Sequence, residues 1–111
     1  MSKPRIYISG PISGHDIEER RKAFKRTQKK LEAQGFEVWN PMENGLPDEA
    51  TTNEHMHRDL AELTNEERPF WAIYMMRRWT HSKGCKVEFD VATAIGLHFY
   101  FEEIGTMVKF E

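Results

Sequence analysis

Residues 79–92 read WTHSKGCKVEFDVA, and this stretch decides the fold because it predicts a short loop that leads into a helix. Glu88 has an unusual position on that helix. It lies only about 20° in azimuth from Ile95 and about 60° from Val91. A carboxylate beside an apolar stripe, in the first turns of a helix, indicates a group with a function. The helical period predicts that this buried stripe consists of Val87, Val91, Ala94 and Ile95.

The loop before the helix has the features of an anion-binding turn. Ser82 offers a hydroxyl, Lys83 a positive charge and Gly84 a flexible backbone. Free N–H groups at the start of a helix favour a negatively charged ligand. We therefore expect Glu88 to act on a ligand that the Ser82–Gly84 loop holds.

The composition sets broad limits on the kind of protein. The chain has 111 residues, a net charge of −2, 31% charged residues and 12% aromatic residues. We expect one domain over residues 1–111, and the balanced charge favours neither nucleic acid nor an acidic partner. With Cys85 as the single cysteine and no long apolar run, the expected location is the cytoplasm, without a membrane contact.

Strand and helix patterns alternate along the chain. Apolar, β-rich runs predict strands at 5–9, 36–39, 70–76 and 97–101, and a short apolar run at 107–110 suggests a fifth. Helical patterns occupy 16–34, a segment from about residue 53, and the segment that contains Glu88. This order predicts an α/β fold, a Rossmann/flavodoxin-like three-layer sandwich with a four- to five-stranded, mainly parallel sheet. Ligands bind such sheets at the carboxyl ends of the strands.

The first predicted helix is rich in basic residues. They suggest either a nucleic-acid surface or the solvated face of an amphipathic helix, balanced by Glu18, Glu19 and Glu32. The solvated face is favoured because such helices usually carry charges on the outside. The basic residues are Arg20, Arg21, Lys22, Lys25, Arg26, Lys29 and Lys30.

Strands one and three of a parallel sheet are expected to be neighbours, so the Gly10 loop and the Ser82 loop should face each other. Between them we expect Tyr7 or Ser9, together with the carboxylates of Asp59 and Glu88. Paired carboxylates suit glycosidic chemistry. The alternatives are a surface position for Asp59, and for Glu88 an ion pair with one of two nearby arginines, Arg77 or Arg78. Trp79 is expected to form a wall of the pocket.

The histidines and the cysteine predict no metal site and no cofactor. His55 and His57 are two positions apart on a helix and point to different faces, so they are poor co-ligands. Cys85 lies near a helix start, where a thiolate is favoured, but a packed small residue is the preferred interpretation.

Four segments together resemble one protein family. YISGPISG at 7–14, NP at 40–41, RDL at 58–60 and WTHSKGCKVE at 79–88 resemble the nucleoside 2-deoxyribosyltransferase-like superfamily, above all its small phage- and bacteria-associated members. The resemblance covers most of residues 3–101. It implies that Glu88 is a nucleophile that attacks C1′ and releases the base, with Asp59 and Tyr7 beside the sugar. It also implies no metal, and a dimer or higher oligomer.

The residue six positions before the glutamate separates two groups within this superfamily. Base-exchanging transferases tend to have an acid there, whereas the related 2′-deoxynucleoside 5′-monophosphate N-hydrolases have a serine. This chain has Ser82, and a hydroxyl stabilises a phosphate where a carboxylate would repel it. The resemblance therefore implies a 5′-phosphorylated ligand. The residues expected to bind substrate are Ser9, Gly10, Ser13, Gly14, Asn40, Trp79, Ser82, Lys83 and Gly84.

Three functions follow from these observations. The first is a nucleotide N-glycosidase or deoxyribosyltransferase with Glu88 as nucleophile. The second is a module that binds or senses a nucleotide without cleaving it. The third, less favoured, is nucleic-acid binding through the basic first helix, which requires a steep salt dependence.

Overall fold

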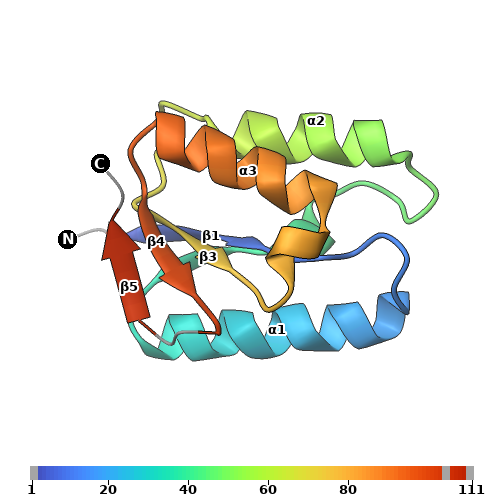
Figure 1. Ribbon diagram of the computed structural model, residues 1–111, viewed down its shortest axis with the longest axis horizontal. Coiled ribbons are helices and arrows are strands. Elements are labelled where there is room, and N and C mark those ends of the chain that lie inside the picture. Colours follow the sequence, from blue (N-terminus) through green and yellow to red (C-terminus); the bar gives the residue numbers. More distant parts are fainter. Residues whose placement is uncertain (1–2, 104–105, 110–111) are drawn as a thin grey trace.

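The computed structural model describes residues 3–103 and 106–109. Five strands form one sheet in the order β2-β1-β3-β4-β5, with α1 on one face and α2 and α3 on the other (Figure 1). The strands are β1 (Arg5–Ser9), β2 (Glu37–Trp39), β3 (Ala72–Met75), β4 (His98–Phe101) and β5 (Thr106–Lys109). The helices are α1 (Ile17–Ala33), α2 (Thr52–Leu63) and α3 (Lys83–Ala94), with 3₁₀ turns η1 (Pro41–Glu43) and η2 (Trp79–His81).

The predicted fold class is confirmed. Strands β1 to β4 are parallel, and β1 and β3 are neighbours, with Tyr7 opposite Ile73 and Ser9 opposite Met75. The fifth strand runs antiparallel to β4 over Thr106–Lys109. Phe110, which the sequence placed in that strand, lies outside the described residues. No helix in the described part of the chain is long and apolar enough to cross a membrane.

Local sequence explains where the helices begin. Asp16 caps α1 by accepting from the N–H of Glu19 at 3.0 Å. Thr51 and Glu54 form a reciprocal capping box, which starts α2 one residue earlier than expected. Ser82 caps α3 through the N–H of Cys85 at 3.2 Å.

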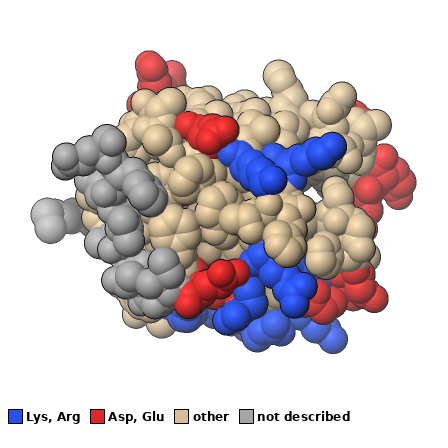
Figure 2. All heavy atoms as spheres, viewed as in Figure 1, with Lys and Arg blue, Asp and Glu red and all other residues tan. Residues whose placement is uncertain are grey.

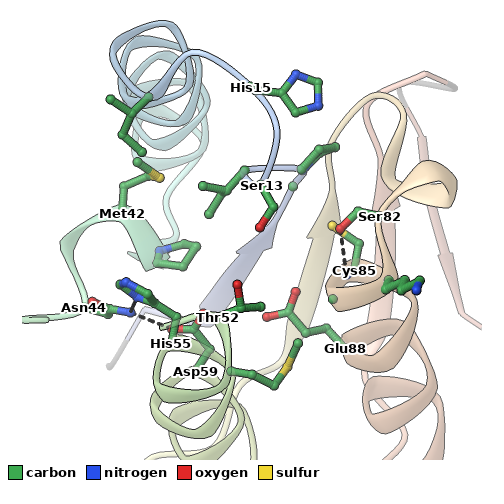
Figure 3. A pocket seen from close by; sticks show the side chains of 18 of the residues that line it. Ser13, His15, Met42, Asn44, Thr52, His55, Asp59, Ser82, Cys85 and Glu88 are labelled. Atoms are coloured by element: carbon green, nitrogen blue, oxygen red, sulfur yellow. Dashed lines mark hydrogen bonds between the residues drawn. The ribbon is translucent and has the colours of Figure 1, made fainter. Parts of the chain in front are cut away.

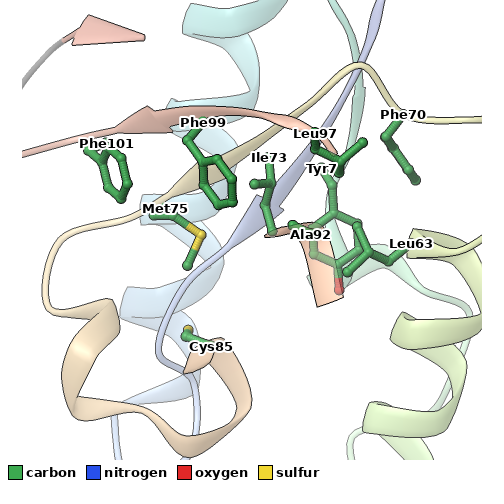
Figure 4. Packing of buried hydrophobic residues seen from close by; sticks show 10 residues of the cluster. All are labelled: Tyr7, Leu63, Phe70, Ile73, Met75, Cys85, Ala92, Leu97, Phe99 and Phe101. Atoms are coloured by element: carbon green, nitrogen blue, oxygen red, sulfur yellow. The ribbon is translucent and has the colours of Figure 1, made fainter. Parts of the chain in front are cut away.

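The alternation of side chains along β1 divides the core into two layers. Ile6 and Ile8 face α1, whereas Tyr7 and Ser9 face the opposite side, toward α2 and α3. Figure 4 shows Tyr7 among the apolar side chains of this second layer. The period-two geometry of a strand therefore aims two hydroxyl groups at α3.

The predicted buried stripe of α3 is wrong for Val87, Ala94 and Ile95, which are exposed, whereas Val91 packs against the core as expected. Val87 is 41% exposed and Ile95 is 47% exposed, whereas Cys85, Glu88 and Ala92 are buried. The helix carries apolar residues on two faces, so periodicity alone does not determine which face packs inward. The small side chains of Cys85 and Ala92 meet the sheet, and this rotation carries Glu88 fully into the interior.

Candidate active site

A cavity of about 690 Å³ opens at the carboxyl ends of the strands. Its lining comes mainly from the loop after β1, the segment between β2 and α2, α2 itself, the segment that joins β3 to α3, and α3, which carries Glu88. Figure 3 shows side chains from these segments converging on Glu88. The cavity therefore lies where a parallel sheet places its ligands.

Glu88 lies at the inner end of this cavity and is 7% exposed. The Tyr7 hydroxyl donates to Oε2 of Glu88, and the Ser9 hydroxyl donates to Oε1 at 2.7 Å. Both oxygens of the carboxylate are thus held by groups from β1. Among the described residues Glu88 makes no ion pair, so its charge is balanced by hydroxyl dipoles alone.

Burial raises the pKa of Glu88 from 4.5 to about 7. The hydrogen bonds from Tyr7 and Ser9 lower the pKa, and the nearby negative charge of Asp59 raises it. At neutral pH Glu88 therefore exchanges readily between carboxylic acid and carboxylate. Burial and the Glu88 charge also raise the pKa of Tyr7 well above 10, so this phenol remains a hydrogen-bond donor.

Asp59 faces the cavity from α2. Nδ2 of Asn44 lies 3.0 Å from Oδ1 of Asp59 and 3.1 Å from Nδ1 of His55 (Figure 3). Oδ1 of Asn44 accepts from the N–H of Leu46 at 3.0 Å, which ties the loop to the site. Burial raises the pKa of Asp59, and the Asn44 hydrogen bond opposes that shift. The site thus holds two carboxyl groups in different environments.

The cavity lining also includes polar and positively charged groups. Ser13, Arg78, Ser82, Lys83 and Gly84 all line the cavity. Arg78 has a left-handed backbone, with φ 66°, which is uncommon for a residue with a side chain. A Cβ on Gly84 would lie 3.1 Å from Cε of Met56, so glycine permits the close approach of α2 to the start of α3.

Five residues expected at the site lie elsewhere or act indirectly. Tyr7, expected beside the sugar, is fully buried outside the cavity lining and reaches the site only through its hydrogen bond to Glu88. Ser9 is fully buried beneath Glu88. Gly14 and Trp79 do not line the cavity; Gly14 lies in a turn with φ 82°, and Trp79 stacks on Phe89 at 4.7 Å. Asn40 is buried outside the lining, where its side chain accepts from the N–H of Met42 and so caps η1. Gly14 and Asn40 complete turns, Trp79 makes a core contact, and Ser9 supports the Glu88 carboxyl from below.

The two non-functional alternatives for the acids do not hold. Arg77 pairs with Glu102 at 3.5 Å, and the hydrogen-bond partners of the Glu88 carboxyl among the described residues are Tyr7 and Ser9, so neither arginine binds Glu88. Asp59 is partly buried and lines the cavity, so it is not a surface acid.

The site residues expected from sequence did not include His55, Asn44 or Arg78, although Arg78 was expected near Ser82. His55 and Asp59 are four residues apart on one helix, a spacing that places them on one face and could have linked them. No local signal marks Asn44, because its role depends on a loop folding over α2. The described residues contain no cluster of three or more His, Cys, Asp or Glu that could hold a metal ion.

Comparison with known proteins gives a family but no activity. A family described as "Domain of unknown function (DUF4406)" matches residues 4–101. The chain belongs to this family. No curated protein and no solved structure matches it. The DUF4406 match spans β1 to β4 and every residue that lines the cavity, so the buried Glu88 and its partners lie within the family's domain.

Proposed function

We propose that this DUF4406 protein cleaves the bond between base and sugar of a 2′-deoxynucleoside, preferably a 5′-monophosphate, with Glu88 as the nucleophile. The observation that carries the proposal is the buried Glu88 carboxyl at the inner end of a large cavity, held by two hydroxyl groups and free of basic partners. When this carboxyl is ionised, no basic side chain neutralises its charge. A nucleophile that attacks a sugar carbon with cationic character needs such a charge.

The reaction would proceed in two steps. In the first, a carboxylate oxygen of Glu88 bonds to C1′ while the C1′–N bond breaks and its electron pair leaves with the base. Asp59 stays beside the sugar, where it holds a hydroxyl or assists the departing base. In the second, the oxygen of a water molecule bonds to C1′ while the C1′–Glu88 bond breaks and Glu88 leaves as carboxylate. The proton that the water loses goes to the departed base, and deoxyribose 5-phosphate is released. A second base in place of water would make the protein a deoxyribosyltransferase.

Electrostatics favours a phosphorylated substrate. Arg78 and Lys83 bring positive charge to the cavity, and Ser82 and Ser13 bring hydroxyl groups. Charge-assisted hydrogen bonds of this kind are the strong ones in phosphate recognition. In the proposed complex Ser13, Ser82 and Gly84 contact the phosphate, while Ser9 acts through Glu88.

The deciding experiment is incubation with a panel of nucleosides and 5′-monophosphates, followed by chromatography of the released base. Glu88→Gln should lose nearly all turnover while keeping its fold. Asp90→Asn, an exposed acid on the same helix, is the matched control and should retain turnover. Full activity in the Glu88→Gln variant would refute the assignment. A sugar adduct on the peptide that contains Glu88, seen by mass spectrometry after rapid quenching, would support the covalent step.

A nucleotide-binding module without turnover is the second candidate. It is favoured by the engagement of both Glu88 oxygens in hydrogen bonds and by the raised pKa, which leaves a large part of the population protonated at neutral pH. This candidate predicts heat of binding in calorimetry without any free base after long incubation. Release of base in that incubation excludes it.

The proposal extends to assembly and location. By resemblance to the deoxyribosyltransferase-like superfamily, we expect a homodimer in the cytoplasm and no metal or other cofactor. Light scattering coupled to size-exclusion chromatography gives the mass in solution. A monomer with full activity would remove the dimer from the proposal.

A further inference from the structure

A second hollow, of about 320 Å³, lies on the opposite face of the sheet from Glu88. It is bounded by α1 on one side and by the end of β3 and the residues after it on the other. Its floor includes the buried side chains of Thr27, Tyr74 and Met76. No residue lines both this hollow and the candidate active site.

Basic side chains dominate the rim of this hollow. Arg20, Arg26, Lys30 and Arg77 line it, against Glu19 and Glu102. Figure 2 shows Lys and Arg side chains gathered over α1 at the lower edge of the molecule, with acidic side chains beside them. The rim therefore carries an excess of positive charge around a concave surface.

The contacts within the hollow leave much of that charge available. Nζ of Lys30 donates to the Tyr74 hydroxyl at 3.0 Å, which orients the ammonium group without neutralising it. Arg26 makes no hydrogen bond or ion pair with any described residue. Arg77 is paired with Glu102 at 3.5 Å, and Arg20 approaches Glu19 at 3.4 Å, both longer than a strong charge-assisted contact.

Two of the four basic residues of α1 outside the hollow are matched by acids, whereas Lys22 and Lys29 are exposed without an ion pair to any described residue. Arg21 contacts both Glu18 and Asp48, and Lys25 pairs with Glu43 at 3.0 Å. The charge along the helix is therefore interrupted, which does not suit the long backbone of a nucleic acid. A small anion that fits the hollow suits this pattern better.

We propose that this hollow is a second ligand site, which binds a chain of linked phosphates such as that of a nucleoside di- or triphosphate. Arg20 and Lys30 are ten residues apart on α1, a rise of about 15 Å, which exceeds the reach of a single phosphate group. Arginine forks suit phosphate oxygens, and Lys30 adds a point charge held by Tyr74. The proposal is independent of the chemistry at Glu88.

The site also touches the loop that lines the active-site cavity. Nε of Arg20 donates to the carbonyl oxygen of Pro11 at 2.8 Å, and Pro11 lines the other cavity. A ligand that draws Arg20 into the hollow would therefore compete with a contact that holds the Pro11 loop.

Calorimetric titration with tripolyphosphate, pyrophosphate and inorganic phosphate tests the site. We expect tripolyphosphate to bind most tightly. The double variant Arg26→Gln with Lys30→Gln should bind tripolyphosphate more weakly by roughly tenfold or more, since each lost charged contact is worth about that factor. The matched control is Lys22→Gln with Lys29→Gln, which removes the same charge from exposed positions of α1 outside the hollow and should change the affinity by less than about threefold.

Amide chemical-shift changes in nuclear magnetic resonance spectra locate the bound anion. Shifts centred on Thr27, Lys30 and Tyr74 support the proposal, whereas shifts confined to residues 82–84 assign the binding to the active site and overturn it. Equal losses in the two double variants would also overturn it. A short single-stranded RNA that binds while tripolyphosphate does not would replace the small-anion site with a nucleic-acid surface.

Discussion

The Ser9 hydroxyl donates a 2.7 Å hydrogen bond to Oε1 of Glu88, although 79 residues separate the two in the chain. Together with the Tyr7 hydroxyl on Oε2, this contact fixes the orientation of the carboxyl group before any ligand binds. Each hydroxyl is supplied by β1, an interior strand paired on both sides with β2 and β3, so the Glu88 carboxyl is held by a strand of the sheet core. Preorganisation of this kind is what a reacting group requires.

The pH dependence of turnover should report the pKa of Glu88. Because the carboxylate is the nucleophile and burial raises its pKa to about 7, kcat/KM should rise with pH through this value. Tyr7→Phe removes a hydrogen bond that lowers the pKa of Glu88. In this variant the rising limb of the pH profile of kcat/KM should therefore move to higher pH. Tyr100→Phe, on the α1 side of the sheet, is the control and should leave the limb in place. A limb that shifts to lower pH in Tyr7→Phe would contradict this account.

Glu88→Gln should stabilise the protein above neutral pH. A carboxyl whose pKa rises from 4.5 to about 7 on folding binds more protons in the folded state, so stability falls as pH increases between these values. The neutral amide in Glu88→Gln does not ionise, so the variant does not lose this stability. The loss in the parent is about 3 kcal/mol at most in the free energy of unfolding. Urea unfolding at pH 8 should give a larger free energy of unfolding for Glu88→Gln than for the parent. At pH 4 this difference should vanish. A variant less stable than the parent at pH 8 would show that the ionised carboxyl is better solvated than its burial implies.

Asn44→Asp should impair turnover without disturbing the loop. The new carboxylate keeps an acceptor for the N–H of Leu46 but faces Asp59 in place of an amide donor. Repulsion should raise the pKa of Asp59 further and lower kcat/KM by at least about tenfold, within the range of acid–base assistance. Asn53→Asp, an exposed position on α2, adds the same charge and serves as the control. Equal activity in the two variants would remove Asn44 from the site.

Substitutions at Ser82 test the phosphate preference. Asp and Asn both cap helices well, so Ser82→Asp and Ser82→Asn should both preserve the start of α3. Only Ser82→Asp places a negative charge beside the proposed phosphate. It should lower the ratio of kcat/KM for the 5′-monophosphate over the nucleoside by at least about tenfold. An unchanged ratio would mean that the phosphate does not lie at Ser82.

Gly10→Ala should destabilise the fold through its close packing. A Cβ at this position would lie 2.5 Å from Sδ of Met76 and 2.9 Å from Cζ of Phe24. We expect a loss of about 1–3 kcal/mol in the free energy of unfolding. In Gly14→Ala no atom lies within 4 Å of the added Cβ, and the positive φ alone should cost about 1 kcal/mol. Urea titrations compare the two, and a larger loss in Gly14→Ala would contradict the packing argument.

Several features of the site were accessible from sequence because they depend on neighbours in the chain. The strand at 5–9 was predicted with its observed bounds, and Ser82 and Gly35 stand at the ends of helices as capping rules require. The parallel order of the strands followed from the helices between them, and it placed the Gly10 and Ser82 loops at one cavity.

The face on which α3 packs depended instead on the whole fold. Val87 and Ile95 formed a plausible apolar stripe, yet they remain largely exposed while Cys85 and Ala92 meet the sheet. The Asn44 bridge between Asp59 and His55 likewise has no local signature. Trp79 was expected at the pocket but packs on Phe89, because stacking within the core competes with exposure to the cavity.

The sequence by itself determined the order of strands and helices, the caps, and the acids at positions 59 and 88, because these depend on residue types and short spacings. Tertiary structure alone decided that Glu88 is buried against Tyr7 and Ser9 and that its pKa rises to about 7. The physical reason is that burial and desolvation depend on which distant surfaces meet. For a helix with apolar residues on two sides, only the packing of the complete chain makes that choice.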